Sequence, residues 1–218
     1  NFRSVTLLKI SFIDTSLESL CMAQELLDNL DCEIHFFSEN AEIGLFGELP
    51  GIVSKWPLLP YSWTTSMYSQ NYKPKCTAVR RSWFEKAIAI SLAKRNTFFH
   101  LRTRITNSEG NKIQFSGAGF SGSGILSFDK ILGISIDSNN TIWYGGVTTT
   151  EIVPNPNLII GKRSDSTIEV WSKRKLPQDI NWIQEMSWKG KTPKNSIESD
   201  IDMGIQRAKN FLNKFNID

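Results

Sequence analysis

The N-terminal segment constrains the fold most, because it alternates between strand and helix patterns. Val5–Ile13 (VTLLKISFI) is an apolar run typical of a buried strand. A helix is predicted next, from apolar residues that recur at three- and four-residue spacing: Leu17, Leu20, Ala23, Leu27 and Leu30. Glu33–Phe37 (EIHFF) is then a second buried strand. A strand–helix–strand unit joins two parallel strands, so the sequence predicts a mixed α/β fold around a parallel sheet.

The composition is typical of a globular protein. The chain has 218 residues, of which 40% are hydrophobic and 22% charged, and no apolar run approaches the roughly 20 residues of a membrane-spanning helix. The net charge of +3 is too small to indicate nucleic-acid binding. Cys21, Cys32 and Cys76 show no C-x-x-C spacing, which predicts reduced, buried thiols and a cytoplasmic protein. His35 and His100 lie among apolar residues, so we expect core histidines and no metal site.

A glycine-rich stretch in the middle of the chain, GAGFSG at Gly117–Gly122, has the G-x-G-x-x-G spacing of dinucleotide-binding loops. Such a loop needs a strand before it and a helix after it, because the helix N-terminus meets the phosphates. Lys112–Ser116 is predicted as a strand, but the residues after Gly124 (ILSFDKILGISI) also have β character. We therefore expect Gly117–Gly124 to be a surface loop between two strands, with at least one glycine at positive φ.

Several segments together resemble the two-dinucleotide-binding-domain flavoproteins, a group that includes lycopene cyclases, geranylgeranyl reductases, flavin-dependent halogenases and aromatic monooxygenases. The opening LLKISFIDTSLESLCMAQELLDNLDCEIHFFSENAEIG is similar to the group's first strand, helix and second strand. Ala78–Arg95 is similar to a helix that carries the group's Arg and Phe, and Ser196–Phe215 to its C-terminal helix beside the flavin ring. The resemblance implies a Rossmann-like, FAD/NAD(P)-binding-like core, a reduced antiparallel β region like the group's substrate domain, and FAD as cofactor.

The turn after the first strand departs from the flavoprotein pattern. Asp14, Ser16 and Ser19 stand where the group has glycine, and their side chains would obstruct a pyrophosphate. Asp14 and Glu18 would also place two carboxylates near the phosphates, a repulsion on the order of several kcal/mol in a partly buried site. Thr15 and Glu18 match the T-x-x-E capping box, which predicts that the helix caps itself. We therefore expect an eroded nucleotide site and no bound cofactor.

The sequence is compatible with three functions. The first is a non-catalytic binding or assembly subunit, since no G-x-S-x-G motif or nucleophile–base pair is visible. The second is an FAD-dependent monooxygenase or reductase that holds flavin through atypical contacts from Ser16, Ser19, Glu39 and Arg80. Glu39 follows the second strand, where dinucleotide folds place a ribose-binding carboxylate, but without a phosphate site we expect it to be solvated. The third is a structural protein of a larger assembly, such as a viral one.

The segment Leu49–Lys75 is rich in proline and turn residues, which predicts an ordered excursion or a contact arm. Its aromatic side chains belong to the types that dominate protein interfaces and are candidate partner-binding residues: Trp56, Tyr61, Trp63, Tyr68 and Tyr72. An equal alternative places these aromatics in the protein's own core. Because flavoenzymes of this group usually have longer chains, we expect a protein partner or a homo-oligomer.

We expect a single domain over residues 1–218, in five consecutive segments. These are the strand–helix–strand opening (1–48), the proline-rich arm (49–75), a helix with a β-hairpin (76–135), short strands (136–175) and a C-terminal helical segment (176–218). Between Thr141 and Lys173 the sequence predicts three strands, with Gly145–Gly146 and Asn155–Asn157 as turns.

Overall fold

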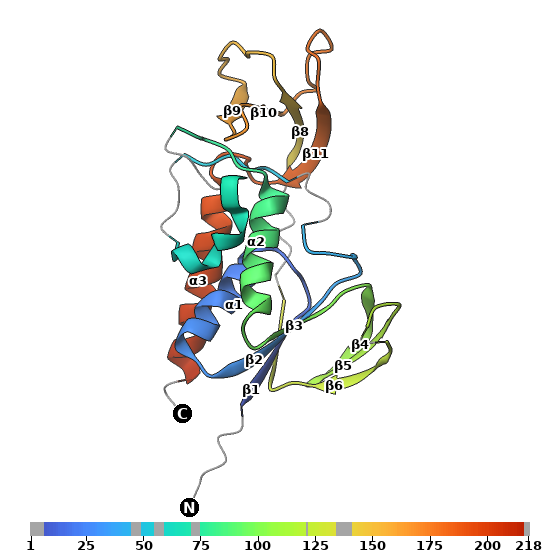
Figure 1. The fold of residues 1–218 in the computed structure, drawn as a ribbon. Helices are drawn as coiled ribbons and strands as arrows, with labels where there is room; N and C mark the ends of the chain where they lie inside the picture. The colour runs from blue at the N-terminus through green and yellow to red at the C-terminus, as the bar shows by residue number, and fades with distance from the viewer. Residues whose placement is uncertain are drawn as a thin grey trace, which may run out of the picture.

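Three β-sheets and three α-helices are seen in the computed structural model, which describes residues 7–44, 49–54, 59–70, 75–120, 122–133 and 141–215. Figure 1 shows helices on one face of a parallel sheet, a small antiparallel sheet to its other side, and a second antiparallel sheet above the helices. The predicted mixed α/β fold with a parallel sheet and an antiparallel region is confirmed.

The parallel sheet has the strand order β3-β2-β1-β7. Its strands are β1 (Leu8–Phe12), β2 (Cys32–Phe37), β3 (Thr97–His100) and β7 (Lys130–Leu132). In β1, Ile10 lies opposite Ile34 of β2 on one side and Lys130 of β7 on the other. β1 and β2 read as apolar runs because a parallel sheet is covered on both faces.

The helices α1 (Leu17–Asn29), α2 (Arg81–Ala93) and α3 (Ser196–Phe215) pack on one side of this sheet (Figure 1). Their apolar sides form the main core with the strands, and Phe12, Leu20 and Ile34 in it are fully buried. Gly204 lets α3 approach α1 closely, since a Cβ at this position would lie 2.3 Å from the backbone oxygen of Glu18. The apolar pattern of the first strand, helix and second strand therefore arises because their side chains pack into one continuous core.

The small antiparallel sheet contains β4 (Thr103–Glu109), β5 (Lys112–Gly117) and β6 (Gly124–Ser127), in the order β4-β5-β6. It packs on the parallel sheet through a second core in which Phe37 meets Ile113, Phe115 and Phe128. The glycine-rich loop joins β5 to β6, and Gly122 has a φ of 62°. Because a strand follows this loop, the prediction of a loop between two strands is confirmed.

The upper antiparallel sheet has the order β11-β8-β10-β9. Its strands are β8 (Thr141–Thr148), β9 (Leu158–Lys162), β10 (Ile168–Ser172) and β11 (Gln184–Gly190). Two expectations are corrected here. Gly145 and Gly146 are not a turn but lie inside β8, because the rings of Trp171 and Trp182 would come within 2.7 Å and 2.4 Å of a Cβ at these two positions. The segment 176–218, expected to be helical, contains β11 before α3.

Two short 3-10 helices of the arm, η1 (Tyr61–Trp63) and η2 (Thr65–Gln70), contact α2. Trp63 is only 1% exposed, and its Nε1 donates to Asp28 Oδ2 at 3.3 Å. The prediction of Trp63 as a partner contact is therefore wrong, because this side chain belongs to the protein's own core. Tyr61 is 74% exposed. Trp56, Tyr72 and the side chain of Tyr68 lie outside the described residues.

Cys21, Cys32 and Cys76 are free and buried, as predicted. Within the described ranges, no helix combines the length and apolar character needed to cross a bilayer. The same residues contain no group of three side chains that could hold a metal ion.

Candidate functional site

The carboxyl edge of a parallel sheet is where open α/β folds bind their ligands. In this protein β1 ends at Phe12 and β7 at Leu132, and α1 begins beside them at Leu17. Ile13 N donates to Leu132 O at 3.0 Å and ties the ends of the two strands together. This edge and the first turn of α1 form the candidate site.

Ser16 caps the N-terminus of α1. Its backbone is extended (φ −64°, ψ 160°), and its Oγ accepts a hydrogen bond from Ser19 N at 3.2 Å. The Ser16 hydroxyl donates in turn to Asp14 Oδ1 at 2.6 Å, and Ser16 N donates to the same oxygen at 3.1 Å. The predicted capping box is therefore wrong in its residues. The helix does cap itself, but through Ser16 instead of Thr15.

Glu18 pairs with α3 instead of closing the capping box. Its Oε1 accepts from Arg207 Nη1 at 2.5 Å, and Arg207 Nη2 donates to Gly133 O at 2.8 Å. One guanidinium therefore links α1, α3 and the residue after β7. Sequence reasoning missed Arg207. The signal in the sequence is Gly204 one turn earlier, since a glycine inside a helix often marks close packing.

The four residues proposed for an atypical flavin site fall into two places. Ser16 and Ser19 lie in the first turn of α1, and Glu39 is exposed just after β2 at the same edge of the sheet. Arg80 instead precedes α2, where Nη2 pairs with Asp165 Oδ2 at 3.3 Å and the guanidinium lies 5.0 Å from the centre of the Trp83 ring. Arg80 is therefore engaged with the hairpin loop between β9 and β10.

The neighbouring Arg81 is the buried cation of this helix. It donates through Nε to Glu85 Oε1 at 2.9 Å and pairs through Nη2 with Asp200 of α3. Burial acts to lower the pKa of Arg81, but Asp200 and Glu85 outweigh it and raise that pKa. These ion pairs hold the start of α2 against α3, and they leave the buried Arg81 cation paired on both sides.

His35 and His100 form a buried pair between the parallel sheet and the small antiparallel sheet. His35 Nδ1 lies 2.8 Å from His100 Nε2, and His35 Nε2 lies 2.8 Å from Glu33 Oε1. A carboxylate only accepts, so the neutral His35 carries its proton on Nε2 and accepts from His100. Burial lowers the pKa of His35, and lowers that of His100 to about 4. Both are core strand histidines, as predicted.

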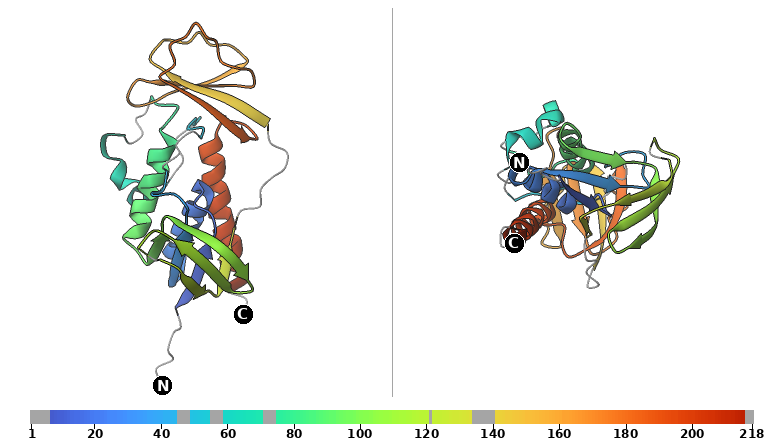
Figure 2. Two further views of the ribbon diagram at one scale, coloured as in Figure 1. Left: turned by 90° about the vertical axis from the view of Figure 1, so that its right-hand side faces the viewer. Right: turned by 90° about the horizontal axis from the view of Figure 1, so that it is seen from below.

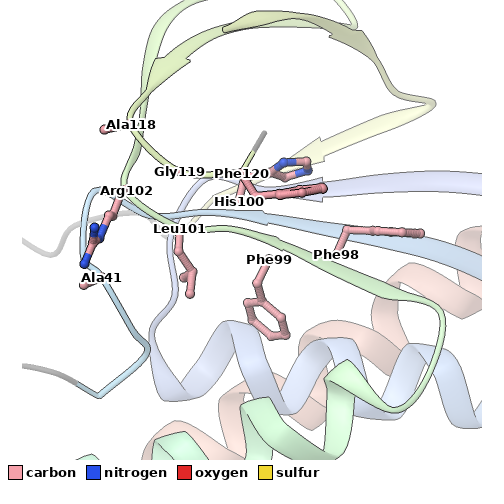
Figure 3. Close-up of a pocket in the computed structure, with 9 residues that line it drawn as sticks. All are labelled: Ala41, Phe98, Phe99, His100, Leu101, Arg102, Ala118, Gly119 and Phe120. Carbon is pink, nitrogen blue, oxygen red and sulfur yellow. The ribbon is translucent and has the colours of Figure 1, made fainter. Parts of the chain in front are cut away.

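A cavity of about 520 Å³ lies beside the end of β3. Figure 3 shows Phe99 pointing toward the helices, whereas His100 points to the other side of the sheet, near Phe120. The cavity is bordered by residues of the 98–102 and 118–120 segments and by Ala41. Its walls are mostly apolar, with Arg102 and His100 as the ionisable side chains in this set.

The residues at the carboxyl edge do not fit the pyrophosphate of a dinucleotide. A pyrophosphate needs open amides at the helix start and glycine where the backbone must approach it. Here the Ser19 amide is bound by Ser16, whose hydroxyl is held by Asp14. The nearby cation, Arg207, is neutralised by Glu18. The arrangement joins secondary-structure elements and engages the Ser19 amide in the first turn of α1.

Comparison with known proteins shows the fold. No protein-family model matches the sequence, and no curated protein sequence matches it. A geranylgeranyl bacteriochlorophyll reductase-like protein from Thermoplasma acidophilum matches with a TM-score of 0.62 at 10% identity, over 94% of this chain and 78% of the other. BexE, from a study of oxidation during BE-7585A biosynthesis, matches with a TM-score of 0.58 at 10% identity, over 92% of this chain. Aklavinone-11 hydroxylase, solved with FAD and aklavinone, matches with 0.57 at 9% identity, also over 92%.

The protein therefore has a flavoprotein-like fold, shared with these structures, and the resemblance found in the sequence is confirmed at the level of the fold. The chain spans 60% of BexE and 61% of aklavinone-11 hydroxylase. At about one residue in ten identical, the similarity carries the architecture and not the activity.

Proposed function

We propose that this protein is a binding or assembly subunit that keeps the flavoprotein fold without holding FAD or catalysing a flavin reaction. The observation that carries the proposal is the side-chain cap on the first turn of α1. Ser16 occupies the Ser19 amide, and Glu18 holds Arg207 against the end of β7. A dinucleotide would have to break these contacts and accept two carboxylates beside its phosphates.

The fold neighbours favour a second candidate, an FAD-dependent monooxygenase or reductase, because one of them was solved with FAD. In this chain such an enzyme would hold flavin through Ser16, Ser19, Glu39 and Arg80. Glu39 is exposed and could reach a ribose, but Ser16 and Ser19 are bonded to each other and Arg80 to Asp165. This candidate therefore requires the α1 terminus to rearrange.

A protein partner is part of the proposal because aromatic surface remains on the arm and on α2. Tyr61 is 74% exposed, Trp83 43% and Ile90 39%. Trp83 and Ile90 are seven residues apart, which puts them on the same side of α2. With the Arg80 guanidinium over the Trp83 ring, this surface includes residue types enriched at interfaces.

A flavin titration series tests the proposal. FAD fluorescence is followed while wild-type protein is added, and the same titration uses a variant with glycine restored (Asp14→Gly, Ser16→Gly, Ser19→Gly) and Glu18→Gln. We expect no saturable quenching by the wild type and measurable quenching by the variant. The control is Ser123→Gly, a matched substitution in the exposed β5–β6 loop. Saturable quenching by the wild type in the low micromolar range would overturn the proposal.

A further inference from the structure

The strand β11 lies at an open edge of the upper sheet. Among the described strands it pairs with β8 alone, in antiparallel register from Gln184 to Gly190. The left view of Figure 2 looks toward this side of the molecule, with β8 and β11 at the front of the upper sheet. An open edge presents backbone N–H and C=O groups that another strand can bind.

The hydrogen-bond alternation of the sheet shows which residues of β11 present these groups. In an antiparallel sheet the N–H and C=O of one residue face the same neighbour, and the next residue faces the other neighbour. Arg163 N donates to Thr167 O at 2.9 Å. By the alternation, the odd-numbered residues of β9 and β10 therefore form the backbone hydrogen bonds between these two strands. Following the registers across β10 and β8, the even-numbered residues of β11 bond to β8. The odd-numbered residues of β11 therefore face outward.

The side chains of β11 also alternate, between the two faces of the sheet. Met186 is buried and Trp188 packs against the same apolar cluster, on the inner face of the sheet. Glu185, Ser187 and Lys189 are exposed on the opposite face. The strand thus carries an acidic residue and a basic residue placed symmetrically about Ser187.

We propose that β11 of a second copy of this chain pairs with β11 in antiparallel orientation, centred on Ser187. In this register Glu185 lies opposite Lys189 of the second copy, and Lys189 opposite its Glu185. Met186 meets Trp188 of the second copy on the inner face. Two opposite-charge pairs and two apolar pairs are formed, each of a kind that stabilises an antiparallel ladder. The strand is self-complementary, as a two-fold interface requires.

This pairing identifies the protein partner of the proposed function as a second copy of the chain. It rests on the proposed function only because that function requires a protein partner. It does not depend on whether α1 binds flavin, so the flavin titration and the test below can fail independently. Seven paired residues bury less surface than a standard interface, so we expect weak association, with a Kd in roughly the micromolar range or above.

Charge reversal with sedimentation velocity tests the pairing over a range of concentrations. Glu185→Lys places lysine opposite lysine, and Lys189→Glu places glutamate opposite glutamate, so each variant alone should be monomeric. Mixed in equal amounts, the two variants restore every opposite-charge pair and should dimerise like the wild type. The double variant Glu185→Lys with Lys189→Glu should also dimerise. Glu151→Lys, an exposed charge change outside β11, is the control.

The backbone part of the proposal is tested by Ser187→Pro, which removes the central outward N–H, against Ser187→Ala, which keeps it. Only the proline variant should be monomeric while its unfolding temperature stays close to that of the wild type. A wild-type protein that stays monomeric at the highest concentrations reached would overturn the proposal. So would a dimer that survives each single charge reversal.

Discussion

Ser16 shows how a single residue decides the state of the candidate site. An N-cap must have an extended backbone and a side-chain oxygen that reaches the amide two or three residues on. Ser16 meets both conditions and bonds to Ser19 N. The flavoprotein pattern has glycine at the corresponding position, which leaves to the phosphate the amide that Ser16 occupies here. At this position a side-chain cap and a phosphate compete for the same amide.

The cap predicts unequal effects of two adjacent substitutions. Ser16→Ala should lower the free energy of unfolding by about 1 kcal/mol, because the Ser19 amide loses its partner. Thr15→Ala should change it by less than half as much, since Thr15 does not cap the helix. Urea denaturation of both variants and of the wild type measures the difference. A larger loss for Thr15→Ala would show that the capping residue is misassigned.

The buried histidine pair predicts that stability falls in acid. In the fold the pKa of His100 is lowered by burial and then by His35 to about 4, whereas the unfolded value is 6.5. The unfolded chain therefore binds more protons between about pH 6.5 and 4, so the free energy of unfolding decreases as the pH falls through that window. We expect a loss on the order of 1–3 kcal/mol, measured by denaturation at several pH values.

A matched variant separates this effect from general acid unfolding. His100→Gln keeps a polar side chain but removes the titration, so its pH dependence between about 6.5 and 4 should be flatter than that of the wild type. Glu33 and Lys9 also border the pair and remain in the variant. An equal slope in both proteins would show that His100 does not control it.

At the scale of elements, Glu169 of β10 holds the upper sheet to the segment before α2. Its Oε1 accepts from Gly51 N and from Trp171 Nε1, each at 2.7 Å, and its Oε2 accepts from Arg163 Nε and Nη2 at 3.0 and 2.5 Å. The carboxylate is fully buried with four donors around it. Such a group stabilises the fold only while every partner is present.

Glu169→Ala should therefore lower the free energy of unfolding by about 3–5 kcal/mol, because it leaves the Arg163 cation buried without its partner. Replacing both residues, as in Glu169→Leu with Arg163→Met, should cost less than the single change. The two variants are compared by chemical denaturation. If the double variant loses as much stability as Glu169→Ala, the buried pair is not the source of the effect.

Element prediction from sequence succeeds at α1 and fails in the upper sheet. The spacing of Leu17, Leu20 and Ala23 predicts α1 because all three side chains pack into one core. Gly145 and Gly146 were predicted as a turn, but their role depends on rings that pack across the sheet from β10 and from the 177–183 segment. β11 was missed because its alternation (QEMSWKG) carries only two large apolar side chains.

For the whole molecule, the fold could be predicted from sequence but the closure of the candidate site only in part. The order of strands and helices predicted the α/β core, the resemblance of several segments implied its likeness to flavoproteins, and the polar residues in the turn after β1 predicted a self-capped helix. The contact between Arg207 and Glu18 spans 189 residues, so no local pattern could have predicted it. Tertiary packing decides which side chain reaches the helix terminus.

The measurement that tests the central claim most directly is the visible absorption spectrum of the protein after dialysis against excess FAD and removal of the free cofactor. The account predicts a colourless protein without flavin bands, because Ser16 closes the α1 terminus and Glu18 and Arg207 hold each other there. A yellow protein that retains one FAD per chain, with both serines needed for retention, would contradict it.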